Sequence, residues 1–236
     1  MSISSRINTI EEHIGDIYDT LELGGFDTIV VPDEYKQLEY IESSGTQYID
    51  TGFKPKGDTS AIIDGIYTPA SDSASIIFGC QSYSAPNYLN TFAFGNGTSS
   101  GYNYISKYDT TTNNATETSD FYSGRKQYKM LKNNVYVNDT LITSFTAGTF
   151  TCTYNGFIFA LNYNGVASNY ANLKLYSCMI YDDSTLVRNF IPCIRKSDSV
   201  IGLYDTVNNV FYTNAGTGTF TAGPVVFNKN IQNIPT

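Results

Sequence analysis

Few side chains in this sequence are suited to catalysis, and they are widely spaced. His13 is the only histidine, so the rest of the chain has no imidazole for a Ser-His-Asp or Cys-His mechanism. A retaining glycosidase needs two carboxyl groups about 5 Å apart, and no Glu-x-Asp-x-x-Glu run is present to supply them. Glu39 and Glu42 would face opposite sides of a strand, while Glu117 and Asp120 lie in turn-like contexts. We therefore predict no enzymatic activity, and glycan hydrolysis is the less favoured alternative.

The residues that could bind a metal are also few. Asp182, Asp183 and Asp205 could supply oxygen ligands to calcium, although aspartates in turns more often serve only to form the turn. No cofactor is predicted, and calcium is the one alternative left open. The cysteines are widely separated and have no CxxC spacing, so we expect reduced, buried thiols rather than disulfides or a zinc site. They are Cys80, Cys152, Cys178 and Cys193.

Tyrosine- and asparagine-rich segments predict a binding surface. Tyrosine offers rigid contact area and asparagine offers hydrogen bonds, a combination that suits sugars. The candidate glycan-binding residues of the segment 81–124 are Tyr83, Tyr88, Asn90, Tyr102, Asn103 and Tyr104. A second candidate group is Asn162, Tyr163, Asn164, Asn169 and Tyr170. The alternative is that these tyrosines only pack a β surface.

The elements that position these residues are predicted to be short β-strands. The chain of 236 residues contains 20 Tyr and 14 Phe, and only 15% of its residues are charged, a composition that favours β structure. From Lys36 onward, short apolar runs alternate with turn pairs such as Asn138-Asp139 and Asn208-Asn209. An all-β, antiparallel jelly-roll sandwich over residues 36–236 fits this pattern best.

One long hairpin is predicted near the C-terminus, between residues 172–181 and 185–195. The residues expected to face the core are Leu175, Met179, Tyr181, Val187, Phe190, Ile191 and Ile194. The charged residues Arg188, Arg195, Lys196 and Asp198 are interpreted as edge and solvent-face charges that prevent edge pairing. A charged site is the alternative.

The N-terminal segment 1–23 is predicted to form a trimerising or attachment helix. Large aliphatic residues recur at a period of 3.5, which is the pattern of a coiled coil, and isoleucine at both core positions favours more than two strands. The residues of this seam are Ile3, Ile7, Ile10, Ile14, Ile17 and Leu21. The alternative is an amphipathic helix docked on its own domain. Gly24-Gly25 ends the helix, and residues 24–35 are predicted to be a linker to the body.

The net charge of −8 is concentrated at the start of the chain, because residues 1–35 hold eight acidic residues and one basic residue, Arg6. An acidic arm and a nearly neutral body predict neither nucleic-acid binding nor attraction to anionic lipid. No secretory signal peptide is recognised. No segment approaches the roughly 18 uninterrupted apolar residues of a membrane span, so membrane insertion is not expected.

Two stretches carry a resemblance to a known family. YIESSGTQYIDTGF (residues 40–53) and LYSCMIYDDSTLVRNFIPCIRKSDSVIGLYDTVNNVFYTNAGTGTF (residues 175–220) resemble the LamG-like, concanavalin A-like lectin/glucanase sandwich found in proteins of bacteriophages and gut Firmicutes. Residues 54–172 match only in their general β character. SISSRINTIEEHIGDIYDTLELGG (residues 2–25) resembles the N-terminal segments of predicted phage tail and fibre proteins.

The resemblance implies a subunit of a bacteriophage appendage, a tail or head fibre. The expected assembly is a homotrimer whose arm contacts another virion protein and whose lectin-like head binds a host surface polysaccharide. Its expected location is the virion surface, after synthesis in the host cytosol. A structural decoration protein without a ligand is the alternative.

Overall fold

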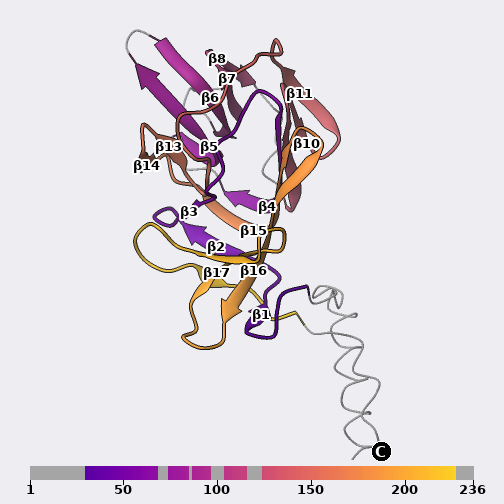
Figure 1. Ribbon diagram of the computed structural model, residues 1–236, viewed down its shortest axis with the longest axis vertical. Helices are drawn as coiled ribbons and strands as arrows, with labels where there is room; N and C mark the ends of the chain where they lie inside the picture. Colours follow the sequence, from indigo (N-terminus) through magenta and orange to yellow (C-terminus); the bar gives the residue numbers. More distant parts are fainter. Residues whose placement is uncertain (1–29, 69–73, 85–86, 97–103, 116–123, 227–236) are drawn as a thin grey trace, which may run out of the picture.

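Two large β-sheets make up the part of the protein that the computed structural model describes (Figure 1). The described residues are 30–68, 74–84, 87–96, 104–115 and 124–226, and they contain strands and no helix. The fold is therefore all-β over these ranges, as predicted. Every pairing between the described strands is antiparallel except the one between β5 and β13.

The first sheet follows the order β11-β10-β9-β4-β15-β16-β17-β18, with β1, β2 and β19 paired beside this path. Its strands are β1 (Tyr35–Gln37), β2 (Ile41–Ser44), β4 (Thr59–Thr68), β9 (Lys126–Leu131), β10 (Asn134–Val137), β11 (Thr140–Ser144), β15 (Asn172–Asp182), β16 (Thr185–Arg195), β17 (Ile201–Asp205), β18 (Val210–Thr213) and β19 (Thr221–Ala222).

The second sheet follows the order β14-β13-β5-β6-β7-β8, with β3 and β12 paired beside it. Its strands are β3 (Ile49–Asp50), β5 (Ser75–Ser84), β6 (Asn87–Asn96), β7 (Tyr104–Asp109), β8 (Thr111–Ala115), β12 (Phe157–Ile158), β13 (Leu161–Tyr163) and β14 (Val166–Ser168).

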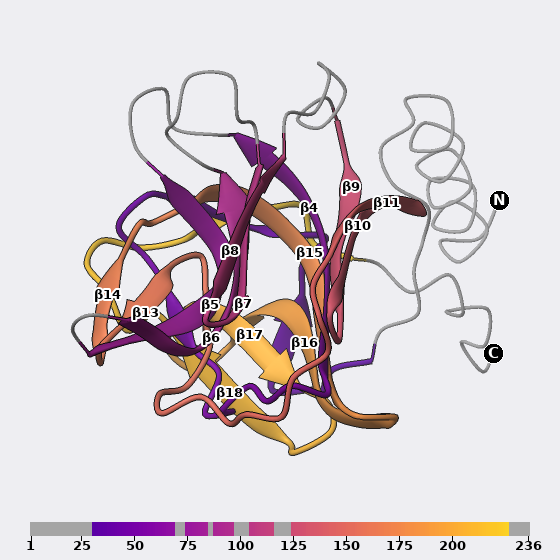
Figure 2. The same cartoon turned by 90° about the horizontal axis from the view of Figure 1, so that it is seen from above.

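The main core lies between the two sheets. Ile63 and Leu175 of the first sheet and Phe78 and Phe92 of the second belong to one cluster of fully buried side chains. Figure 2 shows strands β5–β8 on one side of the molecule and β4, β9, β10, β11 and β15 on the other. Strand β4 shows why the sequence folds this way, since every second residue from Thr59 to Tyr67 is buried, as expected for a strand with one face in the core. The arrangement is consistent with a β-sandwich.

The predicted hairpin is confirmed, but part of its predicted inward face is wrong. β15 and β16 pair from Cys178↔Phe190 to Asp182↔Thr185. A bulge in the pairing of β15 with β4 falls between Leu175 and Ser177. Because a bulge adds one residue to one strand, the buried positions change from Leu173 and Leu175 to Cys178 and Ile180. Met179 and Tyr181 are therefore only half-buried, on the other face of β15.

A second, smaller apolar cluster covers the other face of β16 and β17. Cys193 and Tyr204 pack there with Val31, and Ile191 joins them, whereas Phe190 and Leu203 face the main core. Ile191 thus points away from the side on which it was expected. The Tyr35 ring lies 5.0 Å from that of Tyr204, so the last residues of the predicted linker, from Val30 onward, lie on the body.

Candidate functional site

Two exposed tyrosines lie side by side on adjacent strands of the second sheet. Tyr83 of β5 and Tyr163 of β13 leave 39% and 37% of their surfaces exposed. Their ring centroids are 6.4 Å apart and their planes differ by 21°. Tyr83 comes from the first predicted segment and Tyr163 from the second, so the fold brings one residue of each candidate group together. We call this pair the tyrosine platform.

The platform is built by the parallel pairing of β13 with β5. Tyr163 lies beside Gln81 in the register of this pair. The Asn164 side chain then fixes the neighbouring backbone, because its Oδ1 accepts a hydrogen bond from Tyr83 N at 2.8 Å and its Nδ2 donates to Tyr83 O at 3.2 Å. The amide of Asn164 therefore holds Tyr83 against the strand that carries Tyr163.

A tight turn follows the platform. Asn164 and Gly165 have φ values of 50° and 87° and connect the paired residues Tyr163 and Val166. Asparagine followed by glycine is the preferred sequence for a two-residue turn with positive φ at both positions. Val166 is 67% exposed and extends the apolar surface next to Tyr163.

Asn162 supports the platform rather than forming its surface. Only 4% of this residue is exposed. Its Nδ2 donates to Asn155 O at 3.0 Å, and its Oδ1 accepts from Gly165 N at 2.9 Å. Asn162 was predicted to contact a ligand, and in the structure both ends of its amide are engaged in holding the turn.

Lys107 of β7 contacts Gln81, the residue paired with Tyr163 in the backbone register. Lys107 Nζ donates to Gln81 Oε1 at 2.7 Å, and only 1% of Gln81 is exposed. Burial lowers the pKa of the Lys107 ammonium. This contact orients the amide of Gln81, the residue that lies beside Tyr163 in the register of β5 with β13.

Other predicted binding residues are only partly described, or lie elsewhere. In the backbone register Tyr88 is opposite Tyr83, and Tyr104 is opposite Ala115, but their side chains are outside the described part, as are Tyr102 and Asn103 in full. Asn90 has a φ of 51° in β6. Asn169 Nδ2 donates to Ala74 O at 3.0 Å, which ties the start of β5 to the segment after β14.

Tyr170 belongs to a separate aromatic group. Its ring centroid lies 6.2 Å from that of Tyr48, and Tyr48 stacks on Phe157 at 4.6 Å. Burial raises the pKa of the Tyr48 phenol, and the neighbouring Tyr170 and Asp50 add to the effect. Tyr170 is therefore not placed on the tyrosine platform by any of the described contacts.

The carboxylates considered for calcium have cationic partners instead. Asp182 lies 2.6 Å from Lys56 Nζ, and Asp183 lies 2.6 Å from Lys132 Nζ. The hydrogen bond from Lys132 lowers the pKa of the Asp183 carboxyl. Within the described ranges no group of three or more His, Cys, Asp or Glu residues is placed to hold a metal ion. Glu117 and Asp120 lie outside these ranges.

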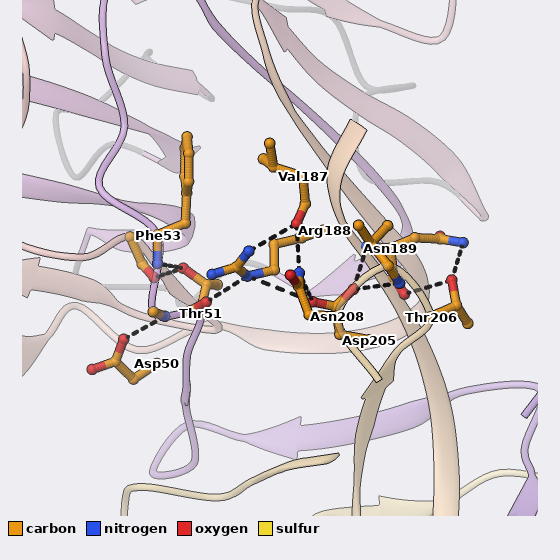
Figure 3. A network of polar contacts seen from close by, with 12 residues as sticks. Asp50, Thr51, Phe53, Val187, Arg188, Asn189, Asp205, Thr206 and Asn208 are labelled. Carbon is orange, nitrogen blue, oxygen red and sulfur yellow. Dashed lines mark hydrogen bonds and ion pairs between the residues drawn. The ribbon is translucent and has the colours of Figure 1, made fainter. Parts of the chain in front are cut away.

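The third of these carboxylates, Asp205, forms a buried network that the sequence did not reveal (Figure 3). Its side chain is fully buried and lies 3.6 Å from Arg188 Nε, whose side chain is 16% exposed. Asp205 Oδ1 accepts hydrogen bonds from Asn189 N at 3.0 Å and Val207 N at 3.1 Å, and Oδ2 accepts from Asn208 Nδ2 at 2.7 Å.

The interpretation of Arg188 as a solvent-face charge is therefore wrong. The available signal was its place in the apolar run Leu186–Ile191, where a long cationic side chain requires a partner if it is buried. Arg195 agrees better with its prediction, because it forms an exposed ion pair with Asp198 at 2.7 Å. Lys196 reaches the carbonyl oxygen of Asp33 at the start of the body.

The two stretches that carry the family resemblance are neighbours in the fold. Gln47 is 2% exposed, and its Nε2 donates to Thr219 O at 3.0 Å. Thr46 Oγ1 donates to Thr217 O at 3.0 Å, and Tyr48 N donates to Asn214 Oδ1 at 3.1 Å. The loop 214–220 is therefore held by the segment 46–48.

The prediction of reduced, buried thiols is confirmed for all four cysteines. Burial raises the pKa of Cys178, and it raises the pKa of Cys193 to about 12. Neither thiol is therefore ionised near neutral pH.

The predicted seam of the N-terminal helix (Ile3, Ile7, Ile10, Ile14, Ile17 and Leu21) lies outside the described residues.

Comparison with models of protein families and with curated protein sequences finds no match for the chain. No helix among the described residues is long and apolar enough to cross a membrane.

Proposed function

We propose that the protein is a non-enzymatic bacteriophage adhesin, a tail- or head-fibre subunit whose lectin-like head binds a host surface glycan. In this proposal the head is a concanavalin A-like jelly roll, and residues 1–23 form a coiled coil that gathers three copies and attaches them to the virion. The sequence resemblance of residues 40–53 and 175–220 supports the family, and the contacts of Gln47 and Thr46 with residues 217–219 support treating these stretches as one structural unit.

The observation that carries the glycan-binding proposal is the tyrosine platform. Single apolar side chains on a surface need no explanation, but Tyr83 and Tyr163 are both exposed, nearly parallel and held from behind by Asn164. Aromatic rings that are ordered before binding lose little conformational entropy when a ligand covers them. The C–H face of a pyranose ring would lie on the tyrosines.

A homotrimer suits such a site. One platform offers a small contact area and therefore weak binding, but three linked copies acting on a repetitive surface polymer can gain about 10²–10⁴ in avidity. The mechanism is therefore adhesion by several weak contacts, and it requires no catalytic group.

Binding of the full-length protein to an array of bacterial surface glycans, with and without calcium, tests this proposal. We expect Tyr83→Ala and Tyr163→Ala each to weaken binding at least about tenfold, the effect of losing an aromatic contact at the centre of an interface. Tyr83→Phe keeps the ring and is expected to retain binding. The control is Leu141→Ala, which removes another exposed apolar side chain, at 53% exposure in the first sheet.

The outcomes distinguish a glycan-binding head from a structural head without a ligand. Loss of binding in both alanine variants, with the control unchanged, supports the adhesin. Glycan binding that persists in both variants would place the site elsewhere, and absence of binding to every glycan would favour a structural decoration protein.

A further inference from the structure

Two hydrogen-bond donors lie next to Gly52 and have no hydrogen-bond partner among the described residues. A methyl group built on Gly52 would lie 3.6 Å from Arg188 Nη2 and 3.8 Å from the Tyr212 hydroxyl oxygen. The described residues contain four buried, unpartnered polar side-chain atoms, and neither of these two is among them. Both donors are therefore within reach of solvent.

The Arg188 guanidinium is held firmly from behind (Figure 3). Nε donates to Thr51 O at 3.0 Å, Nη1 donates to Val187 O at 2.8 Å, and Asp205 lies 3.6 Å from Nε. These contacts use the Nε edge and one side of Nη1. Nη2 is left as the unused end of a group that cannot rotate without breaking three contacts.

Tyr212 is also fixed. It lies in β18, opposite Leu203 of β17, and its ring packs edge-on against Phe190 with a centroid distance of 5.2 Å. Its hydroxyl is at the end of a ring whose position is set by the core. Side chains locked in this way are the usual support of a binding site, because little order has to be created when a ligand arrives.

Gly52 leaves the space in front of the two donors open. It is exposed and has a φ of 64°, a conformation that glycine adopts without strain and that asparagine tolerates. Any larger side chain at this position would begin at van der Waals distance from both donors and would cover them. A ligand atom can occupy this space only because residue 52 has no side chain.

The charges around the donors define what they can bind. Asp205 compensates the charge of Arg188 on its Nε edge. Arg188 Nη2 therefore attracts a ligand by a directed hydrogen bond more than by net charge. Asp50 Oδ1 accepts from Gly52 N at 2.9 Å, and this carboxylate lies on the other side of the 51–53 backbone from the guanidinium (Figure 3). Two donors without a hydrogen bond among the described residues call for an acceptor oxygen, and hydrogen bonds from arginine are strongest to a carboxylate.

Hydrogen bonds of Asn155 connect the residues near Gly52 with those of the tyrosine platform. Asn155 Nδ2 donates to Asp50 Oδ1 at 2.9 Å, and Asn155 O accepts from Asn162 Nδ2 at 3.0 Å. Asn162 precedes Tyr163, and Asp50 lies two residues before Gly52. Asn155 thus connects the side chain of Asn162, next to Tyr163, with the side chain of Asp50, near Gly52.

We propose that Arg188 Nη2 and the Tyr212 hydroxyl bind the carboxylate of an acidic sugar, so that the ligand is a polymer containing hexuronic or similar acid residues. The identification of the ligand as a sugar rests on the proposed function, whereas the carboxylate site stands on the donor geometry. The site is weak as a single unit, because Asp205 neutralises the guanidinium, and it suits a multivalent particle.

A ligand-observed NMR titration of the full-length protein tests the proposal with three probes: sodium glucuronate, methyl β-glucoside and sodium acetate. Tyr212→Phe removes one donor that has no hydrogen-bond partner within the described ranges, and Gly52→Asn covers both donors while tolerating the backbone conformation. Tyr136→Phe is the control, since it makes the same chemical change in β10. Arg188 itself is left intact because it neutralises buried Asp205.

We expect glucuronate to bind more tightly than methyl glucoside or acetate, and both site variants to weaken glucuronate binding about tenfold or more, the effect of one hydrogen bond to a charged group. The control should bind as the unsubstituted protein does. Equal glucuronate binding in all variants, or no preference for glucuronate over methyl glucoside, would overturn the carboxylate site. Acetate binding as tight as glucuronate binding would overturn the sugar.

These results are independent of the platform test. Tyr83→Ala and Tyr163→Ala report on array binding, whereas Tyr212→Phe and Gly52→Asn report on a soluble acid. Failure of one proposal therefore does not imply failure of the other.

Discussion

Replacing Asp205 by alanine should destabilise the protein more than removing any exposed carboxylate. The substitution removes an acceptor from three N–H groups, at 3.0, 3.1 and 2.7 Å, and leaves the half-buried Arg188 without its counter-ion. Breaking a buried ion pair by removing one partner costs about 3–5 kcal/mol. Folded domains are stable by only about 5–15 kcal/mol, so this loss is a large fraction of the total.

A double-mutant cycle shows whether the pair itself is responsible. Arg188→Leu also breaks the pair, so alone it leaves Asp205 buried without its cation. In the Asp205→Ala background the same change removes the uncompensated charge, and its cost should be smaller by about 1–3 kcal/mol. Equilibrium unfolding in urea at neutral pH, followed by far-UV circular dichroism and tyrosine fluorescence, gives the four free energies of the cycle.

The matched control is Asp198→Ala. Asp198 also pairs with an arginine, at 2.7 Å, but in an exposed position, where ion pairs contribute little because water screens them. If Asp205→Ala were no more destabilising than Asp198→Ala, or if the costs of the Arg188 and Asp205 substitutions simply added, the buried pair would not be an important support of this fold.

The remaining predictions concern the loop contacts, the thiols and the arm. Gln47→Leu should lower the free energy of unfolding by about 1–3 kcal/mol, because Ser44 N and Thr219 O, at 2.9 and 3.0 Å, lose their partner. Amide hydrogen exchange should accelerate in residues 214–220, and unchanged exchange there would contradict this prediction. The native protein should not react with a thiol-specific dye at neutral pH, and denaturation should expose four thiols; rapid labelling of the native state would contradict their burial. Burial raises the pKa of Cys193 from 9.0 to about 12. The stability that the protonated thiol contributes is therefore complete below pH 9.0 and is lost as the pH rises toward 12, because the unfolded thiol ionises in this range and the folded one does not. Cys193→Ala should flatten this alkaline decline in the free energy of unfolding. Deleting residues 1–23 should convert a trimer to monomers in light scattering coupled to size-exclusion chromatography, and a trimer that persists would show that the arm is not the trimerising element.

The fold class could be predicted because local pattern and composition carry it. Alternating apolar residues, as in β4, predict a strand, and turn pairs such as Asn138-Asp139 predict a turn, from residues that are close in the chain. The inward face of β15 could not be predicted beyond Leu175. The bulge there depends on pairing with β4, more than 100 residues away in the chain, and one added residue reverses the face of every later side chain.

The candidate site was likewise predicted only in part from the sequence. Residue types alone indicated that Tyr83 and Tyr163 suit a binding surface, but only the parallel pairing of β5 with β13 places them side by side. Asn162 has the same composition signal and is buried, because its amide is needed to hold the turn. A residue type shows what a side chain is able to bind, whereas its neighbours in space decide whether it is free to do so.

The sequence by itself determined that the body has no histidine, and its local pattern predicted the β-strands that the described residues form. Each of these follows from residue identity or from periods of a few residues. Only the tertiary structure decided that Arg188 faces buried Asp205 and that its Nη2 lies with Tyr212 beside Gly52. Those contacts join Gly52 to three later strands, β16, β17 and β18, and their energies depend on burial and distance, which no local pattern encodes.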